Sequence, residues 1–301
     1  MLARDTGIKF DASAFEPRHV MGVTHSLMGH PLLQLSSIVE LGERLAKRGA
    51  VRTHNGNANA GTSFSDAPNT HPTKLSVEEA LHEIESADAW LSLHNVQTDP
   101  LYRTLINDVL DDVKPMVEKY DPGMHDYAGW IFVTSPRAVT PYHMDHENNF
   151  ILQIRGQKLI HVWDPLDRDV VTERSLELFH AKLSRELVIY REEYQSRAYT
   201  FDAKPGMGAY MPQTAPHWVK NGDEVSITIS FTYYTRATER RRLLYRGNQR
   251  LRELGLHPRP IGGSPARDAL ALVALRGVEG AKRIARGRSY VKNPTYELKN
   301  A

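Results

Sequence analysis

The sequence predicts a mainly β protein whose core is an antiparallel barrel or sandwich, with helices at both ends. Between about Tyr127 and Tyr234 the apolar residues recur with the period of two that is typical of strands, and Gly- or Asn-containing turns separate the runs. Before and after this stretch the apolar period is helical. Many short strands with few helices between them are typical of barrels and sandwiches. The 301 residues are enough for one large domain.

Residues 1–120 are expected to form a helical and loop region that packs on the barrel. Residues 36–48 carry Ile38, Leu41 and Leu45 at helical spacing, and Ser36 or Ser37 is available as the cap. Residues 51–74 are rich in Asn, Gly and Ser and lack any periodicity. They predict a long irregular loop, which in a compact protein is either mobile or a lid.

Three further elements are expected before the barrel. Ser76 and Glu79 form a capping-box pattern that opens a short helix. Residues 90–94 read as a short strand. Asp99 and the proline after it start a long helix, with a kink expected at Pro115.

Residues 121–236 are expected to form the barrel. Residues 150–155 and 158–163 flank Gly156-Gln157, which predicts a β-hairpin with a type II′ turn. Asn221-Gly222 predicts a second hairpin before the closing strand. Residues 173–183 are the one helical patch in this stretch.

Residues 237–301 are expected to form a basic C-terminal helical region, interrupted at 257–263. From Arg236 onward the chain has 16 Lys and Arg against 5 Asp and Glu, a surplus of 11. Because the net charge is only +2, the preceding residues carry −9. We expect the basic region to contact the acidic body of its own chain or of a second subunit. An anionic membrane surface and nucleic acid are the other partners considered, and nucleic acid is less favoured because no nucleic-acid motif accompanies the charge.

Composition excludes several classes of site. The chain has no cysteine, so disulfides, thiolate metal sites and cysteine nucleophiles are excluded, and a cytoplasmic location is expected. No apolar run approaches the roughly 20 residues of a membrane span, and the first residues do not resemble a secretory signal. Any metal must therefore be held by His, Asp, Glu or water.

A metal site is predicted from His143, Asp145 and His217. Residues two apart on a strand share a face, so His143 and Asp145 project together, and a histidine on a neighbouring strand completes a facial triad. Two imidazoles and one carboxylate are the ligand set of non-haem Fe(II) oxygenases. The His-x-Asp pattern by itself is expected about 0.8 times by chance, so its context must support the prediction. The alternative for His217 is a core histidine.

Lys158 supplies that context. If Arg155 pairs with Lys158 across the predicted hairpin, Lys158 and Asn149 point into the barrel. A buried ammonium requires an anion, and the distal carboxylate of 2-oxoglutarate would provide one. Thr140 is placed to donate to the same carboxylate. The alternative for Lys158 is a solvated strand residue beside a turn.

Neighbouring residues receive weaker assignments. Glu147 has the parity of the ligands and is expected to line the mouth of the pocket. His146 should face away from the metal, in a supporting or surface position. His161 and Trp163 fall on the opposite face from Lys158 and are expected to be packing residues.

The segment 140–165 resembles the signature of the JmjC and cupin-like 2-oxoglutarate oxygenases, including the asparaginyl hydroxylase that inhibits the hypoxia-inducible factor. The matching features, which cover about a third of the chain, are Thr140-Pro141, His143-x-Asp145, Asn149-Phe150, Gln153-Ile154, Gly156, Lys158, the downstream His217 and the closing strand 227–234.

The resemblance implies a double-stranded β-helix (jelly-roll or cupin) with Fe(II) on His143, Asp145 and His217. It implies 2-oxoglutarate on Lys158 and Thr140, with Asn149 and Ser230 as further contacts, and dimerisation through the C-terminal helices. The chain departs from that hydroxylase at Glu147, where a glutamine contacts the peptide, and at Ser230 and Thr232, which replace an asparagine and a tryptophan. Glu147 and Thr232 are therefore candidate substrate contacts, while peptide specificity does not carry over.

The expected activity is that of an Fe(II)- and 2-oxoglutarate-dependent dioxygenase. Such an enzyme uses O2 to hydroxylate a C–H bond and releases succinate and CO2. The substrate is either a peptide or protein side chain or a small molecule. The alternative function is a non-catalytic cupin-like binding or regulatory module that contacts a partner through its basic C-terminal region.

Overall fold

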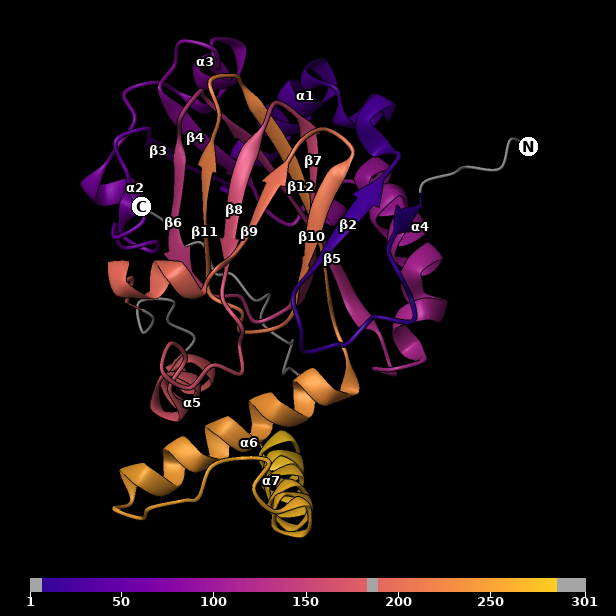
Figure 1. Cartoon of the computed structure of the whole chain (residues 1–301), viewed down its shortest axis with the longest axis vertical. Helices are drawn as coiled ribbons and strands as arrows, with labels where there is room; N and C mark the ends of the chain where they lie inside the picture. The colour runs from indigo at the N-terminus through magenta and orange to yellow at the C-terminus, as the bar shows by residue number, and fades with distance from the viewer. Residues whose placement is uncertain (1–6, 183–188, 286–301) are drawn as a thin grey trace.

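The computed structural model describes residues 7–182 and 189–285, which form two β-sheets and seven α-helices (Figure 1). The strands are β1 Ile8–Lys9, β2 Met21–His25, β3 Val51–Asn55, β4 Ala89–Leu93, β5 His125–Thr134, β6 Val139–His143, β7 Asn148–Arg155, β8 Lys158–Val162, β9 Tyr199–Ala203, β10 Met207–Met211, β11 His217–Asn221 and β12 Ser226–Tyr234. The helices are α1 Leu35–Ala46, α2 Ala67–Thr70, α3 Val77–His82, α4 Pro100–Glu118, α5 Glu173–Lys182, α6 Arg236–Glu253 and α7 Pro265–Ala285.

The two sheets form the antiparallel core that the period-two pattern predicts. The larger sheet has eight strands in the order β1-β2-β10-β7-β12-β5-β4-β3, and the smaller has four in the order β6-β11-β8-β9. Apolar side chains of β7 and β10 from the larger sheet and of β8, β9 and β11 from the smaller one share a buried cluster, so the sheets face each other. This is the mainly β jelly-roll arrangement that was predicted, and the fold class is confirmed.

Both faces of the larger sheet are buried. Its outer face packs against α1, α3 and α4, through Ile38, Leu81 and Val109 among others. On β12 the apolar residues Ile227, Ile229 and Phe231 belong to this outer cluster, and all nine residues of the strand are buried. The alternating Ser and Thr residues of β12 therefore face the interior of the barrel and not solvent.

The N-terminal region contributes more strand than its sequence indicates. Besides the predicted strand near residue 90, β1, β2 and β3 join the eight-stranded sheet. The prediction of an irregular loop over 51–74 is wrong at both ends of that range. Its first residues form β3, which pairs with β4, and the short helix α2 lies near its end. These strands are only two to five residues long and contain polar residues, so the sequence shows no clear strand period there.

The predicted helix boundaries are mostly confirmed. Ser76 and Glu79 make both bonds of a capping box at α3, and Asp99 caps α4, which continues through Pro115 to Glu118. The cap predicted at Ser36 or Ser37 is wrong, since α1 already begins after Gln34. The helical patch at 173–183 is α5, within the described residues.

Both predicted hairpins are wrong. β7 pairs with β10 and β12 in the larger sheet, whereas β8 pairs with β9 and β11 in the smaller one. β11 and β12 likewise lie in different sheets. The two turns lie side by side, since the Gly222 N–H donates to the Gln157 carbonyl at 2.7 Å. Gly156 has φ +71°, and a Cβ there would lie 2.4 Å from the Val225 carbonyl oxygen. Glycine is thus required by a crossing between sheets, which the sequence alone does not distinguish from a hairpin.

The helices α6 and α7 lie together at one end of the barrel, beyond the strand ends (Figure 1). The buried carboxylate of Glu177 on α5 joins α6 to the body through Arg252, with Nε and Oε2 2.5 Å apart. No helix within the described residues has the length and apolarity that crossing a bilayer requires.

Candidate metal centre

His143, Asp145 and His217 come together where β6 ends and β11 begins, at one end of the smaller sheet. His143 ends β6 and His217 begins β11, and the two are directly paired across the ladder. Asp145 follows β6 by two residues. His143 Nε2 lies 3.9 Å from Asp145 Oδ1, and His217 Nε2 lies 3.8 Å from Asp145 Oδ2. One ligand atom from each residue lies within 4.8 Å of the others. The predicted convergence of these three side chains is present.

Backbone carbonyls fix the orientation of both imidazoles. The Nδ1 atom of His143 lies 2.7 Å from the Pro141 oxygen, and that of His217 lies 3.1 Å from the Ala215 oxygen. A carbonyl only accepts hydrogen bonds, so Nδ1 carries the proton in each ring. The lone pair is then on Nε2, which faces Asp145. Such carbonyl contacts are the usual support of metal-binding histidines.

The spacing of the ligand atoms fits one metal ion. Separations of 3.8 and 3.9 Å are too long for hydrogen bonds. They are shorter than twice a metal–ligand bond of about 2.1 Å, so a single ion can contact all three side chains. Two imidazoles and one carboxylate on one side of an ion suit a divalent metal that binds further ligands.

The loop before β11 holds Asp145 in place. The N–H of Thr214 donates to the Asp145 backbone carbonyl at 2.9 Å, and Thr214 itself has φ +66°. A β-branched residue rarely adopts this left-handed conformation, so surrounding contacts must hold it there. Strained residues of this kind cluster at functional sites.

Lys158 points into the same cavity as the triad. Its side chain is 3% exposed and lines the cavity with His143, Asp145 and His217. Burial lowers the pKa of Lys158 from 10.5 to about 7. In the part of the chain that the structure describes, no carboxylate lies within 4.0 Å of its ammonium. Because an unpaired buried charge is costly, this environment suits an anionic ligand. The reading of Lys158 as a solvated residue is wrong.

Thr140, Asn149 and Ser230 also line this cavity. Thr140 Oγ1 accepts a hydrogen bond from Trp90 Nε1 at 2.8 Å. The amide of Asn149 donates to Ser230 Oγ at 3.1 Å, a bond between the neighbouring strands β7 and β12 on the inner face of the larger sheet. Lys158 and Thr140 thus belong to the smaller sheet, and Asn149 and Ser230 to the larger.

Comparison with known families gives a direct result. Residues 33–239 match a family model described as a cupin-like domain, and this match covers more than half of the chain. The chain belongs to the cupin-like domain family. The resemblance to this family is confirmed at this level.

Solved structures are similar to this cupin-like chain only in outline. A structure of YcfD from Escherichia coli has 16% identity and a TM-score of 0.47, covering 90% of this chain and 66% of that one. A structure titled as YcfD, a ribosomal oxygenase, with cobalt and 2-oxoglutarate has 16% identity and a TM-score of 0.44, covering 87% and 63%. The chain therefore spans just under two thirds of the length of these proteins. No curated protein matches it.

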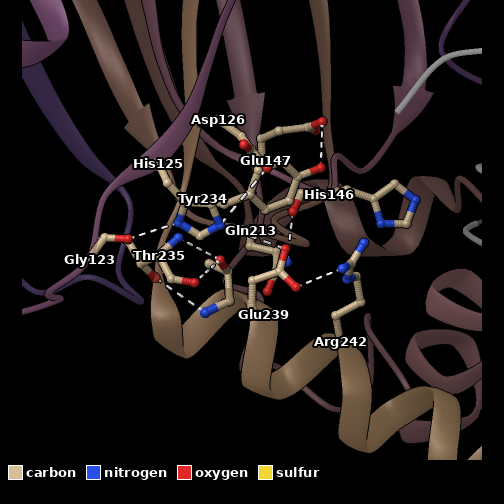
Figure 2. A network of polar contacts seen from close by, with 11 residues as sticks. Gly123, His125, Asp126, His146, Glu147, Gln213, Tyr234, Thr235, Glu239 and Arg242 are labelled. Atoms are coloured by element: carbon tan, nitrogen blue, oxygen red, sulfur yellow. Dashed lines mark hydrogen bonds and ion pairs between the residues drawn. The ribbon is translucent and has the colours of Figure 1, made fainter. Parts of the chain in front are cut away.

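Glu147 and Thr232 line the cavity of the cupin-like barrel as well. Tyr234 donates its hydroxyl proton to Glu147 Oε1 at 2.8 Å (Figure 2). The Thr232 hydroxyl lies 3.3 Å from the Ala128 carbonyl. His146 points away from Glu147 in Figure 2 and stacks on Phe179, with ring centroids 3.8 Å apart. It is 3% exposed, so the surface position considered for it is wrong.

The surroundings of His161 and Trp163 agree with the packing roles expected for them. His161 stacks on Trp218 with centroids 4.3 Å apart, and Trp163 is fully buried beside Tyr142. Neither residue lines the cavity.

Several cavity residues were not predicted from the sequence. They come from the N-terminal part of the larger sheet and the segment after β3, or are apolar residues of the barrel strands: Arg52, Phe64, Ser92, His94, Trp130, Phe132, Ile151 and Val219. Phe64 stacks on His143 with centroids 3.8 Å apart, and the guanidinium of Arg52 lies 4.4 Å above the Phe64 ring. The available signal was the lid expected over 51–74, which contains both residues.

Proposed function

We propose that this chain is an Fe(II)- and 2-oxoglutarate-dependent dioxygenase that hydroxylates a C–H bond. The observation that carries the proposal is the convergence of His143, Asp145, His217 and Lys158 in one cavity. Its support is chemical: the triad suits a divalent ion, and the buried ammonium suits the far end of a dicarboxylate.

The residues divide the work of holding the reactants. His143, Asp145 and His217 would hold Fe(II), which together with 2-oxoglutarate and O2 supplies the oxidising chemistry and yields succinate and CO2. Lys158 pairs with the distal carboxylate of 2-oxoglutarate, and Thr140 donates to it. Asn149, oriented by Ser230, provides a polar contact on the opposite wall. Phe64 shields one face of the His143 ring from water.

Glu147 and Thr232 are proposed to contact the substrate. Most cavity residues are less than 9% exposed, so the space beside the metal suits a small molecule or a single side chain of a peptide. Mass spectrometry of cell extract incubated with the enzyme, with and without 2-oxoglutarate, identifies the material that gains one oxygen atom.

A turnover assay tests the proposal. Purified protein is incubated with Fe(II), ascorbate and 2-oxoglutarate, and succinate is measured. We expect succinate even without added substrate, because these enzymes decarboxylate 2-oxoglutarate slowly on their own. The His143→Ala variant should release none. Equal succinate from both proteins, or none from either, rejects the dioxygenase and favours a non-catalytic binding module.

We also propose that a second copy of the chain packs on the C-terminal helices. Leu254, Leu270 and Val273 are 76%, 74% and 71% exposed, which is unusual for large apolar residues grouped at one end of a molecule. Analytical ultracentrifugation should show a dimer that the Leu270→Asp variant dissociates. A wild-type monomer at micromolar concentration would reject this proposal.

A further inference from the structure

Trp90 lies outside every set of residues assigned above, yet it makes the one side-chain hydrogen bond to Thr140 among the described residues. Trp90 is on β4 in the larger sheet and Thr140 is on β6 in the smaller sheet. The bond therefore joins the two sheets beside the cavity. The distance of 2.8 Å between Nε1 and Oγ1 is that of a normal hydrogen bond, and the indole is only 1% exposed.

The direction of this bond determines what Thr140 can do. An indole N–H is only a donor, so the Thr140 oxygen must accept. A hydroxyl has a single proton, and that proton cannot point toward Trp90 while the indole proton points at the oxygen. It is left to donate elsewhere, and Thr140 lines the cavity that contains Lys158. A hydroxyl donor in the same cavity as the buried ammonium gives a carboxylate bound there a second hydrogen bond.

The surroundings of Trp90 prevent its ring from turning. His54 stacks on one face with centroids 4.6 Å apart and an interplanar angle of 13°. Phe132 packs at 5.7 Å, and Phe64 meets the indole edge-on at 6.4 Å. His54 is buried, and this burial lowers its pKa to about 4, so the stacked imidazole stays neutral at physiological pH. The direction of the indole N–H is thus fixed by packing.

We infer that Trp90 is a positioning residue, which orients the Thr140 hydroxyl so that its proton is presented to an anionic ligand in the cavity. Given the proposed function, on which this inference rests, that ligand is the distal carboxylate of 2-oxoglutarate. Trp90 does not touch the ligand itself. Its effect reaches the ligand only through Thr140, and this indirect path is what can be tested.

The experiment is a double-mutant cycle on 2-oxoglutarate affinity, measured by titration calorimetry with Mn(II) in place of Fe(II) so that no turnover occurs. Thr140→Val removes a hydrogen bond to a charged group and should weaken binding about 10- to 100-fold. Trp90→Phe removes the indole N–H that orients the Thr140 hydroxyl, and should weaken binding about 2- to 10-fold. The double variant should bind no more weakly than Thr140→Val alone. Thr140→Ser should retain most of the affinity.

Trp163→Phe is the matched control. Trp163 is also fully buried and donates one hydrogen bond, to the Tyr194 carbonyl at 2.7 Å, but Tyr194, unlike Thr140, does not line the cavity. Its variant should lose comparable stability without any change in 2-oxoglutarate affinity. Additive effects of Trp90→Phe and Thr140→Val, or equal effects of Trp90→Phe and Trp163→Phe, overturn the inference while leaving the proposed function intact. Absence of 2-oxoglutarate binding by the wild-type protein with Mn(II) overturns both.

A second measurement covers the case in which Trp90→Phe does not fold. In a protein labelled with nitrogen-15, one indole N–H resonance should move when Thr140 is replaced by Val, because the acceptor is lost. The same resonance should move on addition of 2-oxoglutarate to the wild-type protein and stay unchanged in the Thr140→Val variant. If no indole N–H resonance shifts when Thr140 is replaced by Val, the inferred hydrogen bond is contradicted.

Discussion

Replacing the buried ammonium of Lys158 by an apolar side chain should make the protein more stable while removing its affinity for 2-oxoglutarate. Burial lowers the pKa of Lys158 from 10.5 to about 7. Each tenfold change in a protonation constant corresponds to about 1.4 kcal/mol, so burying the charged form costs up to about 5 kcal/mol of unfolding free energy. Lys158→Met has nearly the same length and no charge, and it should recover about 2 to 5 kcal/mol at pH 6.5.

The sign of the pH dependence follows from the same pKa. Between pH 7 and 10.5 the unfolded chain binds a proton at this lysine that the folded chain does not, so wild-type stability rises with pH relative to the variant. The difference between the two proteins should therefore be largest at or below pH 7, shrink by about 1.4 kcal/mol per pH unit above it, and vanish near pH 10.5.

Urea denaturation followed by circular dichroism at pH 6.5 and pH 9 measures this difference. Lys220→Met is the control, because Lys220 is exposed on β11 and should change stability by less than about 0.5 kcal/mol. Mn(II) with 2-oxoglutarate should stabilise the wild type and not Lys158→Met. A Lys158→Met variant that is less stable than the wild type at both pH values would show that the ammonium already has a partner, and would refute the reasoning.

The remaining predictions concern the metal and the fold. Asp145→Ala should abolish Mn(II) binding in calorimetry while the unfolding midpoint without metal stays within a few degrees; retained metal affinity would place the carboxylate ligand elsewhere. Gly156→Ala should destabilise the protein by more than about 1 kcal/mol in urea, because φ is +71° and the new Cβ would meet the Val225 carbonyl. An unchanged midpoint would mean that the turn can shift. Ser76→Ala removes the cap of α3 and should cost about 1 kcal/mol in the same assay, whereas Ser76→Thr should cost little.

The sequence was most informative where a side chain must satisfy a local chemical rule. The capping box at Ser76 and the cap at Asp99 depend only on nearby backbone, and both are present. The prediction that His143 and Asp145 project to the same side also holds, although Asp145 lies just beyond the end of β6. Local rules do not depend on which strand lies alongside, so they can be recognised without knowing the topology.

Strand pairing was not predictable in this way. The turn at Gly156 looks like that of a hairpin, because a glycine with positive φ reverses the chain in both cases. The partner of β7 is chosen by which face each strand buries, and β7 is buried on both faces except at its last residue. Lys158 was nonetheless placed correctly in the interior, although the pairing used to place it was wrong. Arg52 and Phe64 reach the cavity from a polar segment with no period, so the sequence indicated a possible lid there but not which of its side chains enter the cavity.

The distribution of the cavity residues between the two sheets has a consequence for how this protein can change. His143, His217, Thr140 and Lys158 all stand on the four-stranded sheet, whereas Trp130, Phe132, Ser230 and Thr232 stand on the eight-stranded sheet opposite. Under the proposed function, the four-stranded wall holds the metal and the distal carboxylate of 2-oxoglutarate, whereas the eight-stranded wall, apart from Asn149 and Ser230, faces the substrate. Substitutions at Trp130, Phe132 and Thr232 would then change substrate selectivity and leave the residues that hold the metal and 2-oxoglutarate unchanged.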